Sequence, residues 1–134
     1  MNDCIFCKIV AGEVPCHKVY EDENVLAFLD AFPHAKGHTV VVPKRHVNSV
    51  FDFSEDERIK FSAGLSAAVR RVNEVVKPDG MNIGLNDRPA AGQVVPHVHW
   101  HIFPRFEGDG GGSVHSIIKS KAKIDVGEIA KLFA

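Results

Sequence analysis

The 134-residue sequence has almost no net charge, and it lacks both a basic block and a long apolar run. Its 16 lysines and arginines nearly balance its 17 aspartates and glutamates, which leaves a formal charge of −1 at pH 7. Proteins that bind a nucleic-acid backbone usually carry a basic patch, so we expect no nucleic-acid partner. No stretch is long enough to span a bilayer and no cationic, apolar leader is present, so we expect neither a membrane partner nor a signal peptide.

Cysteine is also scarce. The sequence has three cysteines, an odd number, and two of them lie close together. A disulfide framework would need an even and larger number, whereas reduced thiols fit a cytoplasmic protein, and we expect that location. The length and the ordinary apolar fraction of 45% predict a single domain, residues 1–134, with a sizeable core.

The most distinctive stretch has three histidines that alternate with large apolar residues. His97, His99 and His101 are separated by Val98 and Trp100. Successive side chains of a strand point to opposite faces, so we expect a strand over 97–105 with the three imidazoles on one face. Such imidazoles could bind a transition metal, or a neutral imidazole could act as a nucleophile or acid–base group, and the pattern alone leaves both open.

Apolar periodicity and turn residues predict the remaining elements. Ser54 and Glu57 have the spacing of a capping box, and apolar residues at helical spacing follow them, so we expect a long helix over about 55–76. Other strands are expected at 14–20, 25–30, 37–43 and 81–86, an edge strand at 114–123, and short helices at 8–11 and 126–133.

Cys4 and Cys7 form a C-x-x-C pair near the start of the chain. A redox pair would follow a strand and open a helix, and no strand is expected before these residues. The two thiols could instead supply half of a zinc site, which needs two more ligands, or they could be unconnected free cysteines. His38 and His46 flank the valine-rich strand and add two imidazoles that neighbouring strands would bring towards the three-histidine stretch.

Two features near expected strand ends could contact a ligand. Asp30 is either a turn aspartate before Pro33 or a hydrogen-bond acceptor at a strand end. The backbone amides of residues 92–94 could cradle an anion, although a tight turn without a ligand would have the same composition. The glycine-rich stretch 108–113 lacks the spacing of a phosphate-binding loop and predicts a flexible loop.

The three-histidine stretch, with Gly37 and His38 upstream and the segment from Asn86 to Arg105, resembles the histidine-triad nucleotide-binding family. Segments 4–9, 19–22 and 28–30 also match its pattern, so the resemblance covers roughly residues 4–107. It implies a HIT-like α+β fold: an antiparallel sheet of about five strands, one long helix, short terminal helices, and a homodimer whose sheets join across the interface.

The resemblance also implies an enzyme, a nucleotidyl hydrolase or transferase that acts at the α-phosphate of a purine nucleotide conjugate. His99 matches the nucleophile that forms a nucleotidyl-histidine, and His101 matches the group that donates a proton or hydrogen bond near the bridging atom. His97 and His38 match the histidines that orient this pair. The implied contacts of the nucleotide, such as AMP, are Asp30 and Ala31 at the ribose and Asn86, Gly92, Gln93 and Val94 at the ribose and phosphate.

Two details of the resemblance affect the chemistry. Many family members carry Ser or Thr where this chain has Val94, which keeps the backbone amide but lacks the hydroxyl donor. Bacterial-type members often carry a structural zinc, which implies a tetrahedral site made of Cys4, Cys7, His46 and His97 and not needed for catalysis. The competing ligands are Cys16, His17 and His38.

Several functions therefore remain open at this point. The first is a nucleoside 5′-phosphoramidate hydrolase, and a dinucleoside polyphosphate hydrolase would use the same chemistry with another leaving group. A metalloenzyme would use the three histidines of residues 97–101 as metal ligands. A nucleotide-binding or scaffold module would bind AMP with little catalysis.

Overall fold

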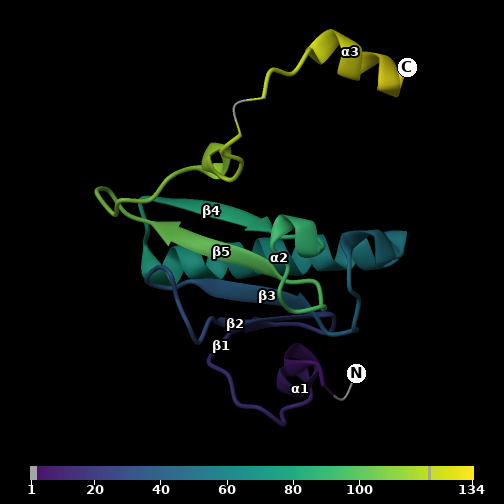
Figure 1. Cartoon of the computed structure of the whole chain (residues 1–134). Coiled ribbons are helices and arrows are strands. Elements are labelled where there is room, and N and C mark those ends of the chain that lie inside the picture. The colour runs from purple at the N-terminus through teal and green to yellow at the C-terminus, as the bar shows by residue number, and fades with distance from the viewer. Residues whose placement is uncertain (1–2, 121) are drawn as a thin grey trace.

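The computed structural model, which describes residues 3–120 and 122–134, contains a five-stranded antiparallel sheet with strand order β1-β2-β3-β5-β4 (Figure 1). The strands are β1 Lys18–Glu21, β2 Val25–Leu29, β3 Thr39–Pro43, β4 Gly80–Leu85 and β5 Trp100–Arg105. Each neighbouring pair is antiparallel. The predicted α+β architecture with about five strands is therefore confirmed.

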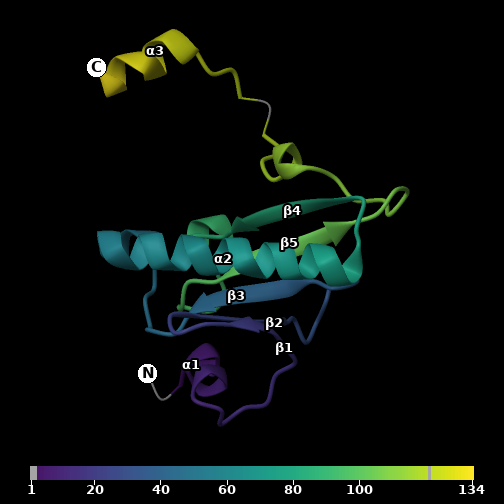
Figure 2. The ribbon, with the colours of Figure 1, turned by 180° about the vertical axis from the view of Figure 1, so that it is seen from behind.

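The long helix α2, Glu55–Val76, has the predicted bounds and lies across one face of the sheet (Figure 2). Ser54 and Glu57 form the capping box in both directions, which satisfies amides of the first turn. The helix ends at Lys77, which has a left-handed φ of 54° and precedes Pro78, a residue that cannot continue a helix. The local sequence alone thus sets both ends of α2.

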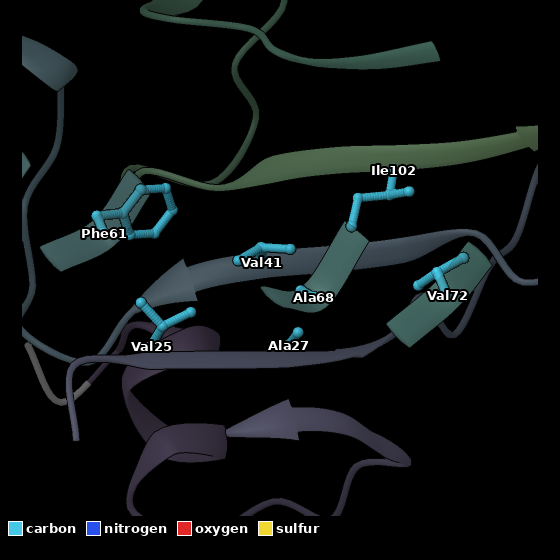
Figure 3. Packing of buried hydrophobic residues seen from close by; sticks show 7 residues of the cluster. All are labelled: Val25, Ala27, Val41, Phe61, Ala68, Val72 and Ile102. Carbon is cyan, nitrogen blue, oxygen red and sulfur yellow. The ribbon is translucent and has the colours of Figure 1, made fainter. Parts of the chain in front are cut away.

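The main core lies between α2 and the sheet. Its buried members are Val25, Ala27, Val41, Phe61, Ala68, Val72 and Ile102 (Figure 3). The helix approaches β2 most closely at Gly64, where a Cβ atom would lie only 2.5 Å from Val25 Cγ2. A smaller second cluster on the other side of β2 and β3 contains Phe6 and Phe28. β3 is buried along its whole length, because the two clusters cover its opposite faces.

The N-terminal helix α1, Ile5–Val10, starts three residues earlier than predicted, because the Cys4 side chain caps it by accepting a hydrogen bond from the Cys7 amide. Short 3-10 turns occur at Val50–Asp52, Pro89–Ala91 and Val114–Ser116. The predicted edge strand at 114–123 is wrong for the described residues of that segment, where only the turn at Val114–Ser116 forms. Position 121 lies outside the described residues.

The predicted C-terminal helix is confirmed as α3, Val126–Ala130, followed by a 3-10 turn at Lys131–Phe133. Figure 1 shows this segment projecting away from the sheet. Among the described helices, none combines the length and apolar character that crossing a membrane requires.

The predicted strand over 97–105 begins only at Trp100, so the first two histidines of the stretch precede it. The register pairs Val41 with Trp100 and would place Pro43, which has no amide hydrogen, opposite Val98. The Val98 amide instead donates to the Val47 carbonyl at 2.7 Å. The expectation that all three imidazoles extend from one strand is therefore wrong, because Pro43 has no amide to pair with Val98 and β4 ends at Leu85, opposite Trp100.

Candidate functional site

His99 lies directly before β5 and is 8% exposed. Its Nδ1 lies 2.8 Å from the backbone oxygen of His97. A carbonyl oxygen can only accept, so Nδ1 carries the hydrogen and the neutral ring has its lone pair on Nε2. None of the described residues forms a hydrogen bond with that Nε2. The arrangement leaves Nε2 available to an electrophile.

A second chain of hydrogen bonds sets the tautomer of His101 on β5. The backbone amide of His34 donates to His38 Nδ1 at 3.2 Å, so His38 carries its hydrogen on Nε2. That nitrogen lies 2.9 Å from His101 Nδ1 and 3.6 Å from a carboxylate oxygen of Asp30. His101 Nδ1 therefore accepts, and its Nε2 carries the hydrogen. The centroids of the His99 and His101 rings lie 5.1 Å apart, so a ring that donates from Nε2 neighbours a ring with its lone pair on Nε2.

Burial keeps these histidines neutral. Desolvation, together with smaller contributions from the neighbouring His99 and His38, lowers the pKa of His101 to about 4, and the opposing effect of Asp30 is smaller. Desolvation lowers the pKa of His38 as well. Both rings are thus neutral at pH 7, which the hydrogen-bond chain requires.

A cleft of about 680 Å³ opens beside His101. Its walls come from β4, from β5 and from residues 111–117, and they include Asp30, His38 and Asn86. One carboxylate oxygen of Asp30 accepts from the Phe32 amide at 2.8 Å, so Asp30 is a turn aspartate as well as a cleft residue. Ala31 is exposed next to it. His99 contacts His101 but is not part of this lining.

The loop after β4 carries the remaining predicted contacts. Gly92 has a φ of +100°, which favours glycine, and a Cβ there would lie 3.7 Å from the Asn86 side chain. Gln93 uses both ends of its amide within the protein: it donates to the backbone oxygens of Asn48 and Val95 and accepts from the Arg88 amide. Its side chain therefore shapes the loop. Val94 is 88% exposed.

The second cluster consists of Cys4, Cys7, His46 and His97, whose ligand atoms all lie within 4.8 Å of one another. His97 Nδ1 is 3.3 Å from Cys4 Sγ and 3.1 Å from His46 Nδ1, and Cys7 Sγ is 3.2 Å from His46 Nδ1. Zinc–ligand bonds of about 2.0–2.3 Å in a tetrahedron separate neighbouring ligand atoms by roughly 3.3–3.8 Å. The donor set and its spacing fit such an ion.

Hydrogen bonds on the far side of each ring aim the two histidines of this cluster. His97 Nε2 donates to the Pro43 carbonyl at 2.9 Å, and His46 Nε2 lies 2.8 Å from Asn48 Oδ1. Both Nδ1 atoms are therefore left as acceptors, as metal ligands must be. Burial raises the pKa of the Cys7 thiol, with Cys4 adding to the effect, and lowers the pKa of His97 to about 4.

The structure brings the four predicted metal ligands together and separates the competing ones. Within the described part of the chain, Cys16 and His17 belong to neither potential metal cluster, and His38 groups with Asp30 and His101. The three histidines of residues 97–101 are thus divided between two places. This arrangement is inconsistent with a single metal site formed by all three histidines.

Several residues that shape the site were not predicted from the sequence. Phe6 packs its ring against His99, with centroids 4.9 Å apart. Asp87 ties the loop after β4 to the Val50–Asp52 turn by accepting from Ser49 Oγ and the Val50 amide. The place of Phe6 between the two cysteines was the one available signal for its position near their cluster. Nothing local in the sequence indicated the Asp87 contacts.

Comparisons with known proteins agree with this geometry. The HIT domain family matches residues 11–108. An uncharacterized HIT-like protein of Methanocaldococcus jannaschii is 47% identical over 131 residues, which cover 96% of each chain. An adenosine 5′-monophosphoramidase of Schizosaccharomyces pombe is 40% identical over 76% of this chain and 74% of its own. An adenylylsulfatase of Arabidopsis thaliana is 38% identical over 92% of this chain and 63% of its own.

Solved structures also resemble this chain. A Streptococcus mutans protein has a TM-score of 0.86 and 41% identity over 99% of this chain and 82% of its own. A zinc-bound histidine triad family protein from Mycobacterium smegmatis has a TM-score of 0.71 and 40% identity over 81% of this chain and 79% of its own. The family match and these identities, together with the paired histidines beside the cleft, establish that the chain belongs to the HIT domain family, the histidine-triad family that its sequence resembles.

Proposed function

We propose that the protein hydrolyses purine nucleotide conjugates at the α-phosphate, with His99 as the nucleophile. The observation that carries the proposal is the hydrogen bond from His99 Nδ1 to the His97 carbonyl, because it leaves the lone pair on Nε2. A neutral imidazole with an available Nε2 is the form that attacks phosphorus. Names of two relatives, adenosine 5′-monophosphoramidase and adenylylsulfatase, support an adenylate conjugate as the substrate class.

The reaction takes place in two displacements. In the first, His99 Nε2 forms a bond to the α-phosphorus, the bond to the leaving group breaks, and the leaving atom gains a proton. In the second, water attacks the same phosphorus and releases a proton to solvent, the phosphorus–nitrogen bond breaks, and the nucleoside monophosphate leaves with a regenerated neutral His99. Each displacement has a lower barrier than direct attack by water.

His101 supports both displacements. Its Nε2 hydrogen, fixed by the chain through His38 and the His34 amide, is available to the bridging atom and the phosphate oxygens. A preorganised donor beside developing negative charge lowers the barrier without reorganisation during the reaction. Since Val94 supplies no hydroxyl and neutral His101 donates only a hydrogen bond, the proton for the leaving atom comes from solvent.

The remaining assignments concern substrate binding. Asp30 accepts hydrogen bonds from the ribose hydroxyls, beside Ala31, and Asn86 contacts the ribose and phosphate. We assign the backbone amides of Gly92, Gln93 and Val94 to the phosphate oxygens, because the Gln93 side chain already bonds within its loop. Bidentate acceptance by a carboxylate suits a ribose with two hydroxyls.

We also propose that Cys4, Cys7, His46 and His97 hold a structural zinc ion. The spacing of the four ligand atoms and the two aiming hydrogen bonds support this, as does the zinc-bound relative. The ion would tie α1 to the loops after β3 and before β5. No step of the reaction uses it.

The assembly proposed for residues 1–134 is one domain in a cytoplasmic homodimer. β4 forms an edge of the sheet, which supports a joint between the sheets of two copies. The reduced state of the four-ligand cluster suits the cytoplasm.

The experiment measures AMP release from adenosine 5′-phosphoramidate and from a diadenosine polyphosphate. Wild type is compared with His99→Ala and with His17→Ala, an exposed histidine outside the cleft lining and both potential metal clusters, each with and without a chelator. We expect turnover that survives in His17→Ala and in the chelated wild type but is lost in His99→Ala. The substrate from which AMP is released faster identifies the preferred leaving group.

Two results would contradict the proposal. Turnover lost on chelation from a still-folded protein would favour the metalloenzyme. AMP binding without turnover of either compound would favour a binding module.

A further inference from the structure

The helix α1 contacts both the four-ligand cluster and His99. Cys4 and Cys7 belong to the cluster, and Phe6 between them is 9% exposed. The Phe6 ring meets the His99 ring at 4.9 Å and 66°, an edge-on contact. It also meets the His97 ring at 5.8 Å and 89°. Edge-on packing is a favoured aromatic geometry and restricts the rotation of both rings.

His99 therefore has two contacts with segments that carry the cluster ligands. In the first, His97 places Nδ1 in the cluster and its backbone oxygen against His99 Nδ1. In the second, α1 places the Phe6 ring against the His99 ring. Phe28 on β2 packs against Phe6 in turn, with ring centroids 5.8 Å apart.

We propose that Phe6 is a positioning residue for His99, through which the cysteine–histidine cluster fixes the tautomer of the nucleophile. This inference rests on the proposed function of His99. With the Phe6 ring in place, the imidazole keeps Nδ1 on the His97 carbonyl and its lone pair on Nε2. Without the ring, the imidazole gains room to turn away from the carbonyl, and the hydrogen moves between the two nitrogens. The lone pair is then on Nε2 for only part of the time.

The test compares Phe6→Leu, Phe6→Tyr and Phe61→Leu. Phe61 is the matched control, because it is 5% exposed and belongs to the core beneath α2, away from the histidines. Two quantities are measured: kcat and KM with adenosine 5′-phosphoramidate, and the ring ¹⁵N signals of His99, which report the tautomer without turnover.

We expect Phe6→Leu to lower kcat about tenfold with little change in KM, the upper end of what one aromatic pair contributes. Its His99 signals should change from one tautomer to a mixture. Phe6→Tyr, which keeps the ring, should retain the single tautomer and most of kcat. Phe61→Leu should lower the melting temperature and leave kcat and the His99 signals unchanged. Chelation of the wild type should shift its His99 signals towards those of Phe6→Leu and lower kcat by no more than Phe6→Leu does, so that turnover survives.

The inference would be overturned by Phe6→Leu with one His99 tautomer and wild-type kcat, or by equal effects of Phe61→Leu. Unchanged His99 signals in the chelated wild type would show that the cluster does not fix the His99 tautomer. These failures differ from failure of the proposed function, which would appear as full activity in His99→Ala.

Discussion

The Gln93 side chain offers a sharp test of how the loop after β4 is held. It makes three hydrogen bonds, of 2.6 Å from the Arg88 amide, 2.9 Å to the Asn48 carbonyl and 3.0 Å to the Val95 carbonyl. Gln93→Met keeps the length of the side chain and removes all three. At about 0.5–1.5 kcal/mol each, the bonds sum to roughly 3 kcal/mol. Because Arg88 and Asn48 are exposed and can bond to water, we expect a net loss of about 1–2 kcal/mol.

Gln93→Glu extends the test. A carboxylate can still accept from the Arg88 amide but cannot donate to either carbonyl, so it should destabilise the loop at least as much as methionine does. Urea denaturation gives the free energy of unfolding. KM for adenosine 5′-phosphoramidate reports how well the loop's backbone amides are positioned to bind the substrate phosphate. Both variants should raise KM more than they lower kcat. A loss below about 0.5 kcal/mol with unchanged KM would refute the reasoning.

Three further predictions concern other parts of the molecule. Gly64→Ala should destabilise the protein by about 1–3 kcal/mol despite the better helix propensity of alanine, because the new Cβ would lie 2.5 Å from Val25 Cγ2; a raised melting temperature would contradict this. Burial lowers the pKa of His101 from 6.5 to about 4. On acidification, the His101 imidazole therefore binds a proton in the unfolded chain at a higher pH than in the folded protein. The stabilisation by neutral His101 should thus be complete above about pH 6.5 and lost as the pH falls towards 4, and His101→Asn should flatten the measured stability profile there. Asn48→Ala removes the partner of His46 Nε2 and should weaken zinc affinity about tenfold in a competition with a chelating dye; unchanged affinity would argue against the aiming role.

Local signals in the sequence were sufficient for α2 and for the approximate places of the strands. The capping box of Ser54 and Glu57 and the stop at Pro78 act within one turn of the helix, so its ends could be predicted to the residue. The start of β5 could not, because it depends on its register with β3, where Pro43 offers no amide, and on the end of β4 opposite Trp100. The short turn at Val114–Ser116 likewise had no periodic signal, and its apolar residues suggested a strand.

The candidate site shows the same limit. The spacing of the histidines predicted which residues matter, but their division between two clusters follows from long-range contacts such as His97 Nε2 with the Pro43 carbonyl. The role of the Gln93 side chain within its own loop depends on Asn48, which is 45 residues away in the sequence. The packing of Phe6 against His99 brings α1 to the residue before β5, and no local sequence pattern predicts this contact.

The most direct measurement is a search for the covalent intermediate. Wild-type protein is mixed with adenosine 5′-phosphoramidate, quenched with base within milliseconds to seconds, and digested for mass spectrometry of the peptide that contains residues 97–101. The account predicts an adenylyl group on His99 that appears before AMP accumulates and disappears as substrate is exhausted. Release of AMP without any adduct on His99, or with the adduct on His101, would contradict this mechanism.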